Sequence, residues 1–367
     1  MMLPSPRVVA TAAIAVACVV GLVLVLALGG GSDSRPATGA GGTPPARLRA
    51  VTVSWVGDMS LSSELGLPPL RGAGPLAGVR RALEGDLTLG NLEGTLGSGG
   101  SSKCGPDSKD CVTFRAPAAY ARVYAEAGFD VLNLANNHAF DFGAKGFRQT
   151  ARALDRARVG HVGEAGRVEL RRVRGTTVAL IGFAPYAWAS PMRDLPAARR
   201  LVQQAGRGAD VVVVTMHAGA EGADQTHTPT GVERAFGENR GDTRAFAHAV
   251  VDAGADLVLG SGPHVVRGLE LYRDRLIAYS LGNFLTYNTL EQGGTLSLSG
   301  ILRVRLDGSG RPRAARWVSV RLVEPGIPRV DTDGESARLV SRVSRADFGP
   351  RGLAVDRAGR VRLPRAG

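Results

Sequence analysis

Short apolar runs alternate with amphipathic segments rich in alanine and arginine along most of this chain. The apolar runs are typical of buried strands, and segments such as 118–127, 146–157 and 243–253 are typical of surface helices. This alternation predicts an α/β fold in which helices cover a sheet. The predicted strands are 51–56, 87–89, 131–134, 178–183, 211–214, 257–259 and 276–279.

The pattern changes towards the carboxyl end of the chain. Apolar and polar residues alternate over 295–306 and 313–323, which predicts antiparallel strands that complete the sheet. The predicted folded domain therefore covers residues 49–325. Residues 326–367 are predicted to form a looser, basic C-terminal tail.

The amino terminus predicts attachment to a membrane. No residue from Val8 to Leu28 is charged, and such a run can cross a bilayer as a helix. Residues 1–28 are therefore a transmembrane anchor or a signal segment, and the length of the apolar run favours an uncleaved anchor. Residues 29–48, rich in Gly, Ser and Pro, predict a flexible linker. The folded domain would then lie outside the cytoplasm, on a single-pass membrane protein.

The cysteines agree with export. Cys104 and Cys111 bracket a short polar loop, and in an oxidising compartment a local disulfide is the simple interpretation. A zinc pair is the alternative, but no nearby Cys or His completes a tetrahedral ligand set.

The formal net charge of +12 does not indicate a nucleic-acid-binding protein. Only three of the basic residues are lysines, the arginines are scattered, and no nucleic-acid motif accompanies them. Nucleic acid is therefore excluded as a partner. An anionic polymer or an acidic membrane surface remains compatible with the charge.

Candidate chemistry lies at the ends of the predicted strands. Ligands of open α/β sheets bind beyond the carboxyl ends of the strands, so polar side chains there are expected to converge. Five strands each end in a side chain that can bind a metal, most of them next to glycines that allow sharp turns. These residues are Asp58, Glu93, Asn137, His217 and His264.

This donor set predicts metal-assisted hydrolysis. Carboxylate oxygens, an amide oxygen and neutral imidazoles suit Mn, Zn or Fe, with one or two ions bound. Glu93 is the candidate bridge between two ions, and His138 is the candidate proton donor to a leaving group. Asn136, Arg267 and Asn283 are candidate contacts to an acidic substrate, although capping of turns and a solvated surface explain them equally well.

The order of these motifs resembles the CapA-type capsule-synthesis family, whose domain is similar to calcineurin-like metallophosphoesterases. The resemblance covers residues 50–300 and implies a four-layer αββα sandwich, here with an N-terminal membrane helix. It places Asp58, Glu93, Asn137, His217 and His264 on metal-ligand positions and His138 on the catalytic histidine. The segments that carry it are Gly57-Asp58, Asn91-Leu92-Glu93, 133–138, His217 with Gly219 and Glu221, 254–260, 263–266 and 279–284.

Two positions depart from the phosphoesterase pattern. The first strand ends in Asp58-Met59-Ser60 where the pattern has Asp-x-His, and 260–264 lacks one histidine of Gly-His-x-His. Water, Glu221 or His227 would fill the vacant positions, or one metal would bind, or the site would not catalyse. Glu221 is also a candidate substrate contact.

The resemblance implies a role in making capsule or another cell-envelope polymer of bacteria. One hypothesis is a membrane-anchored, metal-dependent hydrolase or transferase that acts on an anionic polymer such as poly-γ-glutamate. The other is a non-catalytic polymer-binding component of a capsule-synthesis membrane complex. Fold alone does not choose between them.

Overall fold

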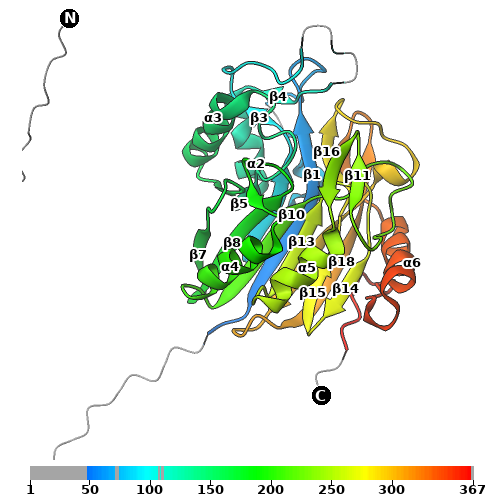
Figure 1. Ribbon diagram of the computed structural model, residues 1–367. Helices are drawn as coiled ribbons and strands as arrows, with labels where there is room; N and C mark the ends of the chain where they lie inside the picture. Colours follow the sequence, from blue (N-terminus) through cyan, green and yellow to red (C-terminus); the bar gives the residue numbers. More distant parts are fainter. Residues whose placement is uncertain (1–47, 71–73, 106–107, 109–110, 365–367) are drawn as a thin grey trace, which may run out of the picture. The chain divides into compact units, whose positions relative to one another are not determined.

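Two β-sheets form the centre of the protein in the computed structural model, which describes residues 48–70, 74–105, 108 and 111–364 (Figure 1). The first sheet has the order β19-β18-β17-β1-β2-β5-β6, and β16 pairs with β1. β1 is parallel to β2 and β16 and antiparallel to β17. These strands are β1 (Val51–Leu61), β2 (Leu87–Leu92), β5 (Val131–Asn133), β6 (Gly160–Val162), β16 (Asn283–Tyr287), β17 (Leu298–Leu306), β18 (Pro312–Val323) and β19 (Ile327–Val330).

The second sheet has the order β14-β15-β13-β10-β8-β7, and β9 pairs with β8. Its central strands β8, β10, β13 and β15 are parallel. These strands are β7 (Glu169–Val173), β8 (Thr176–Ala184), β9 (Ser190–Pro191), β10 (Val211–His217), β13 (Leu257–Ser261), β14 (Leu269–Tyr272) and β15 (Arg275–Ala278). Two short ribbons are β3 (Thr95–Leu96) with β4 (Arg115–Ala116), and β11 (Glu233–Ala235) with β12 (Glu238–Gly241).

Helices cover the outer faces of both sheets. α1 (Arg80–Leu83), α2 (Ala121–Ala127) and α3 (Gly143–Arg156) pack on the first sheet, and α4 (Leu195–Gly206) and α5 (Thr243–Asp252) pack on the second. A third apolar cluster fills the space between the sheets, because alternate side chains of each strand point to opposite faces. The order of layers is therefore helices, sheet, sheet, helices. Short 3-10 helices lie at Ala77–Val79, Ala118–Tyr120, Gly294–Ser297 and Gly349–Arg351.

The α/β prediction is confirmed, and each of the seven predicted apolar runs lies on a strand of the two sheets. The carboxyl end differs from the predicted loose tail. Within 326–364, β19 pairs with β18, and α6 (Glu335–Phe348) packs Leu339, Val340 and Val343 into the core between the sheets. These three side chains recur at i, i+1 and i+4, which places them on one face of the helix. The residues from 338 to 345 are otherwise polar or charged, so the sequence shows no clear apolar pattern for a helix.

The predicted segments 1–28 and 29–48 lie outside the described residues, apart from Leu48. Contacts divide the chain after Pro45, and the unit Ala46–Gly367 contains both sheets and all six helices described above. Among the residues that the structure describes, no helix combines the length and the apolar character needed to cross a bilayer.

Candidate metal centre

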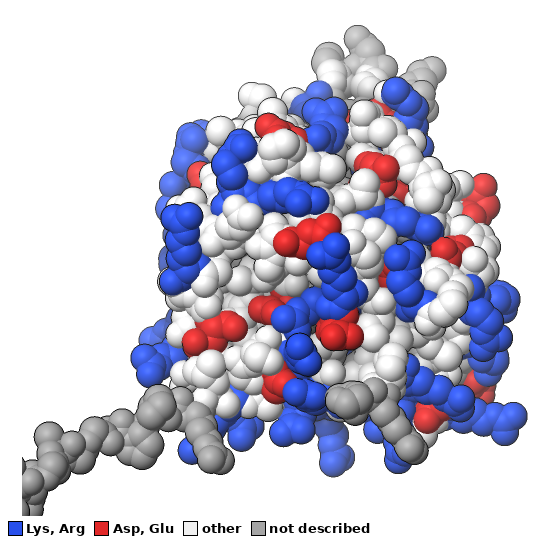
Figure 2. Space-filling model, turned by 60° about the horizontal axis from the view of Figure 1, so that its bottom comes forward, with Lys and Arg blue, Asp and Glu red and all other residues white. Residues whose placement is uncertain are grey.

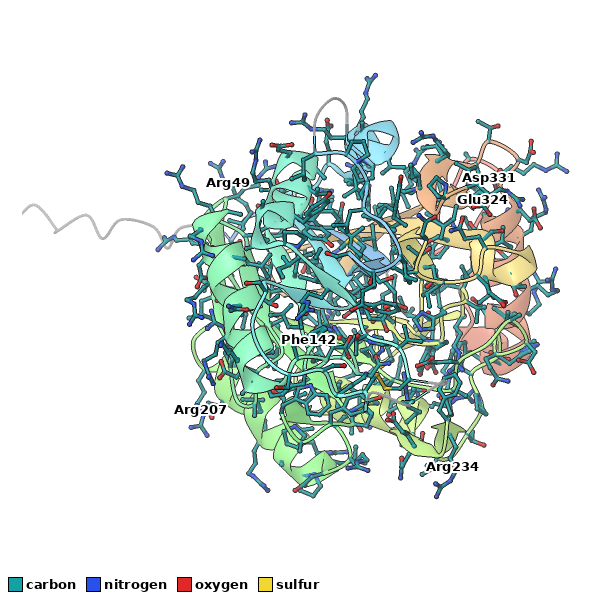
Figure 3. The ribbon with its side chains drawn as sticks, turned by 90° about the horizontal axis from the view of Figure 1, so that it is seen from above. Arg49, Phe142, Arg207, Arg234, Glu324 and Asp331 are labelled. Atoms are coloured by element: carbon teal, nitrogen blue, oxygen red, sulfur yellow. A yellow bond between two sulfur atoms is a disulfide. The ribbon has the colours of Figure 1, made fainter. Side chains whose placement is uncertain are left out.

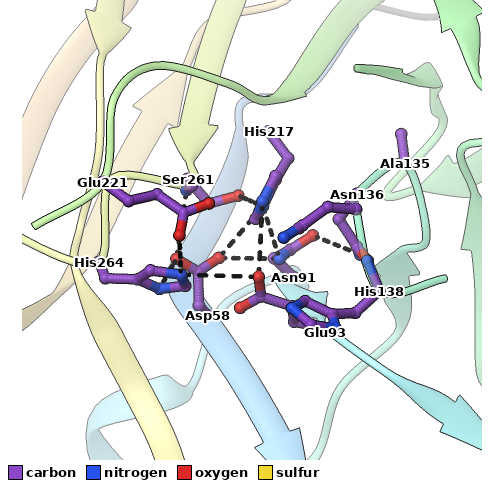
Figure 4. A network of polar contacts seen from close by, with 12 residues as sticks. Asp58, Asn91, Glu93, Ala135, Asn136, His138, His217, Glu221, Ser261 and His264 are labelled. Carbon is purple, nitrogen blue, oxygen red and sulfur yellow. Dashed lines mark hydrogen bonds and ion pairs between the residues drawn. The ribbon is translucent and has the colours of Figure 1, made fainter. Parts of the chain in front are cut away.

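Four of the predicted ligands, Asp58, Glu93, His217 and His264, converge where the two sheets meet, at the carboxyl ends of their central strands (Figure 4). Asp58 and Glu93 come from the first sheet, and His217 and His264 come from the second. The Trp55 indole fixes the sheets to each other below the site, because its Nε1–H donates to the Gly260 carbonyl at 3.1 Å. One buried polar cluster therefore combines residues more than 200 positions apart.

Asp58 lies at a bulge in β1, where the strand passes very close to the start of β16. Its backbone N–H donates to the Gly282 carbonyl at 3.0 Å. A Cβ on Gly57 would lie 1.8 Å from that same carbonyl oxygen, so only glycine fits before the aspartate. Burial alone would raise the pKa of Asp58, but hydrogen bonds from His217 and His264 outweigh it and lower the pKa below its ordinary value.

Glu93 follows β2 and is completely buried. Neither of its carboxylate oxygens has a hydrogen-bond partner among the described residues, although buried carboxylates are almost always paired. Burial raises the pKa of Glu93 well above its ordinary value; His264 opposes this, and the Asp58 charge adds to it. A buried anionic ligand without a partner is the arrangement that a cation would complete.

The two histidines face Glu93 with one ring nitrogen each. His217 Nε2 lies 3.5 Å from Glu93 Oε1 and has no hydrogen-bond partner among the described residues. His264 Nε2 lies 3.7 Å from the same oxygen. Burial lowers the pKa of His217. Burial would also lower the pKa of His264, but the Glu93 and Glu221 charges outweigh it and raise that pKa well above its ordinary value.

Asn283 orients His264 instead of lying open to a substrate. Its Oδ1 accepts from His264 Nδ1 at 2.9 Å, which leaves Nε2 to face Glu93. His264 also has a φ of 62°, an uncommon conformation for a residue with a side chain. Such strain is tolerated where the surroundings hold a functional group in place.

A network of amide side chains supports the ligands, and the sequence analysis had singled out only Asn136 among them. Asn91 Nδ2 donates to Asp58 Oδ1 at 2.8 Å and contacts His217 Nδ1 at 3.1 Å. Asn91 Oδ1 accepts from Asn133 and Asn136 at 2.8 and 3.2 Å. Asn136 is fully buried and also donates to a backbone carbonyl of β2. It therefore holds the loop in place, whereas the sequence suggested a substrate contact.

His138 forms a pair with Asp141, a residue that the sequence analysis did not single out. His138 Nδ1 lies 2.9 Å from Asp141 Oδ2, and Lys103 Nζ lies 2.7 Å from Asp141 Oδ1. The His138 ring also packs 4.3 Å from the Phe114 ring. Burial lowers the pKa of His138, while the hydrogen bond and charge of Asp141 act in the opposite direction. In the sequence, the feature that could have identified Asp141 was its position three residues after His138.

The disulfide prediction is confirmed by a bond between Cys104 and Cys111. Lys103 directly precedes it, and the Lys103 ammonium also donates to the Asn137 carbonyl at 3.3 Å. The side-chain oxygen of Asn137 is buried and has no hydrogen-bond partner among the described residues.

Glu221 lies at the rim of the cluster, and its Oε2 is 3.5 Å from His264 Nε2. The buried Arg240 guanidinium lies 2.5 Å from its other oxygen. Burial would raise the pKa of Glu221, but His264 and Arg240 lower it to about 2. His227, the other candidate to fill a vacant position, instead pairs with Asp347 at 2.6 Å and is exposed.

Arg267 does not face the site. It is fully buried, pairs with Glu233 at 2.7 Å, and donates to the backbone carbonyls of Gln225 and Ala220. It therefore holds the 218–233 segment together, and a contact with substrate would require that these bonds break. In the sequence, a single basic residue after a strand does not show whether it contacts a substrate or holds a segment of the protein together.

The comparisons with known proteins identify a sequence family and relatives of this chain. The sequence family described as bacterial capsule synthesis protein PGA_cap matches residues 52–288. The capsule biosynthesis protein CapA of Bacillus anthracis is 36% identical over 190 residues, which are 46% of this chain and 42% of that protein. The PGA biosynthesis protein CapA of Bacillus subtilis is 31% identical over 216 residues, which are 52% of this chain and 51% of that protein. The chain thus spans about half the length of these curated relatives.

Among solved structures, a hypothetical protein from Thermus thermophilus is 19% identical, with a TM-score of 0.45 over 73% of this chain and 98% of that chain. The family match extends over more than half of the chain and includes each of the five predicted ligands and His138. The chain therefore belongs to the bacterial capsule synthesis protein PGA_cap family.

Proposed function

We propose that this protein is a divalent-metal-dependent hydrolase or transferase that acts on an anionic capsule or cell-envelope polymer. The observation that carries the proposal is the set of buried ligand atoms that face one another without hydrogen-bond partners. These atoms are both carboxylate oxygens of Glu93 and Nε2 of His217. Leaving them unpaired would be costly, so a cation is the natural partner.

The distances fit metal coordination. Two ligands that bind one ion at about 2.0–2.2 Å lie roughly 3–3.6 Å apart. His217 Nε2 lies 3.5 Å from Glu93 Oε1, within this range, and His264 Nε2 lies 3.7 Å from the same oxygen, just beyond it. Because Glu93 Oε1 is common to both histidines, it suits a bridge between two ions. We propose a metallophosphoesterase-like site for Mn, Zn or Fe, with one or two ions bound.

A bound divalent ion would supply Lewis-acid activation of water and of the bond that is cleaved. The protein supplies orientation and proton transfer. Asp141 fixes His138 through Nδ1, which leaves Nε2 as the nitrogen that can pass a proton to the leaving group. Asn91 contacts both Asp58 and His217, and so fixes the position of one side chain relative to the other across the two sheets.

The proposed setting is the outer face of a bacterial cell membrane. The uncharged run of residues 8–28 would anchor the chain as a single-pass protein, and the Cys104–Cys111 disulfide suits an oxidising compartment. The partners would be poly-γ-glutamate or a similar polymer and a capsule-synthesis membrane complex.

One observation favours the non-catalytic alternative. The positions where the phosphoesterase pattern has further histidine ligands fall on Ser60 and on Ser261 or Gly262, and the two serine hydroxyls bind within the protein. Ser60 Oγ lies 2.5 Å from Thr289 Oγ1, and Ser261 Oγ lies 3.2 Å from His217 Nδ1. A cleft with fewer ligands could hold an anionic chain without cleaving it.

Metal analysis of the purified full-length protein, followed by turnover assays with phosphoesters and γ-glutamyl oligomers, separates the two functions. The enzyme proposal expects bound metal, and expects metal and turnover to be lost together in Asp58→Ala and His217→Ala. Glu126→Gln is the control, because Glu126 lies on the surface of α2 and its one ion-pair partner among the described residues is Arg122. If the purified protein contains no metal and shows no turnover, the enzyme proposal is refuted and the non-catalytic polymer-binding function remains.

A further inference from the structure

The outer face of α3 carries a continuous basic stripe. Lys145, Arg148, Arg152 and Arg156 are exposed, and their spacing of three or four residues places them on one side of the helix. The stripe spans about 16 Å at 1.5 Å per residue. None of the four has an acidic partner within ion-pair distance among the described residues. The single acidic side chain of α3, Asp155, lies 3.6 Å from His161.

The stripe leads away from the proton-handling pair of the candidate metal centre. α3 begins at Gly143, two residues after Asp141, and Figure 3 shows Phe142 towards the middle of the end that bears the site. Two further cations continue the stripe to His138. The Arg115 guanidinium lies 3.7 Å from the centre of the Phe142 ring, and Lys103 lies 2.7 Å from Asp141.

A groove runs beside the stripe. It has a volume of about 320 Å³, and its lining includes Gln149, Arg152 and Arg156 from α3 together with Gly97 and Ser98. The loop approaches the helix closely because Gly97 and Gly99 have no side chains: a Cβ on either would lie within 3 Å of Gln149 or Lys145. An extended chain could therefore lie along α3 with its charged groups beside the arginines.

Other basic surfaces of the protein differ from this one. On the face at the amino ends of the central strands, acidic side chains lie among the basic ones (Figure 2). Several arginines there are already paired, as Arg174 is with Asp86 and Arg275 with Asp256. α6 carries a comparable exposed stripe of Arg338, Arg342 and Arg345 beside a groove of about 400 Å³, but it packs against β14, β17 and β18 and does not begin next to a site residue. It provides a matched control.

We propose that the basic stripe of α3 is a docking track for an extended polycarboxylate chain, which it guides to the metal centre. The proposal rests on the proposed polymer substrate and adds where the polymer is held. Arginine suits this role because its planar guanidinium can pair with carboxylates through two hydrogen bonds. Binding along the track would depend on salt, since exposed charges are screened.

The test is binding of poly-γ-glutamate to the full-length protein at two salt concentrations. We expect the triple variant R148Q/R152Q/R156Q to bind about tenfold more weakly, because exposed ion pairs are individually weak and three are lost. The control R338Q/R342Q/R345Q removes the same charge from a helix of the same length and should bind within twofold of wild type. Glutamine keeps helix propensity close to that of arginine.

Equal losses in both triple variants, or no loss in the α3 variant, would overturn the proposal. Circular dichroism checks that each variant folds, and the single variant R152Q serves if the triple variant does not. Metal binding separates this proposal from the catalytic one, since R148Q/R152Q/R156Q should weaken polymer binding and still bind metal like wild type. Loss of metal in this variant would show that the substitutions disturb the metal centre itself and would contradict a separate track.

Discussion

Replacing Glu93 by Gln should stabilise the metal-free protein and remove its response to metal. Glu93 is fully buried, and neither carboxylate oxygen has a hydrogen-bond partner among the described residues. Burial raises its pKa, so the free carboxylate is unfavourable in the folded state. Gln has the same shape without the charge, and its amide can donate to a neighbouring ring nitrogen.

The expected magnitude follows from the cost of an unpaired buried acceptor, about 1–3 kcal/mol. Both folded and unfolded chains hold the proton below the ordinary pKa of 4.5, so wild type keeps its full stability there. As the pH rises towards the raised pKa of the folded state, only the unfolded chain releases the proton, and wild type loses stability. In EDTA at pH 8, Glu93→Gln should therefore be more stable by about 1–3 kcal/mol.

With metal present, wild type should have a larger free energy of unfolding than Glu93→Gln. An ion at a thousand times its dissociation constant stabilises wild type by about 4.1 kcal/mol, and the variant should gain little. Urea unfolding followed by circular dichroism, in EDTA and in Mn²⁺ at pH 5 and pH 8, measures each free energy of unfolding. Glu126→Gln on the surface is the matched control. A variant less stable than wild type in EDTA at pH 8, or equally stabilised by Mn²⁺, would refute the reasoning.

Three further outcomes are expected. Gly57→Ala should weaken metal binding at least tenfold in a calorimetric titration, although it touches no ligand, because its Cβ would lie 1.8 Å from the Gly282 oxygen. Glu221→Gln should cost about 3 kcal/mol at pH 7 by leaving the buried Arg240 without its closest partner. That cost should shrink as the pH falls from 4.5 through about 2, because Glu221 itself then becomes protonated in the folded protein. Trp55→Phe should cost about 2 kcal/mol in urea, since it leaves a small cavity and an unpaired carbonyl of β13.

Much of the architecture was predictable because it depends on local pattern. Apolar runs such as 211–214 identify buried strands, and metal-binding side chains directly after them must lie at one edge of a parallel sheet. That reasoning brought Asp58, Glu93, His217 and His264 together before any coordinates. It gave no reason to expect two facing sheets, because a strand does not encode which sheet it joins.

Residues whose roles depend on their partners were not predictable. Asn136, Arg267 and Asn283 have the same chemistry as substrate contacts, yet the structure assigns each of them to bonds within the protein. Asn91 and Asp141 were missed for the converse reason. Their importance comes from contacts with His217 and His138, which the chain alone does not reveal.

The sequence by itself determined which side chains end the strands, and therefore which ligand types this protein can offer a metal. Only the tertiary structure decided which ligand atoms remain unpaired and how far apart they lie. The physical reason is that strand formation depends on residues close together in the sequence, whereas the site depends on residues far apart in it. Strand formation follows from the spacing of neighbouring apolar residues, whereas the 3.5 Å between His217 and Glu93 depends on how two sheets pack through a shared core.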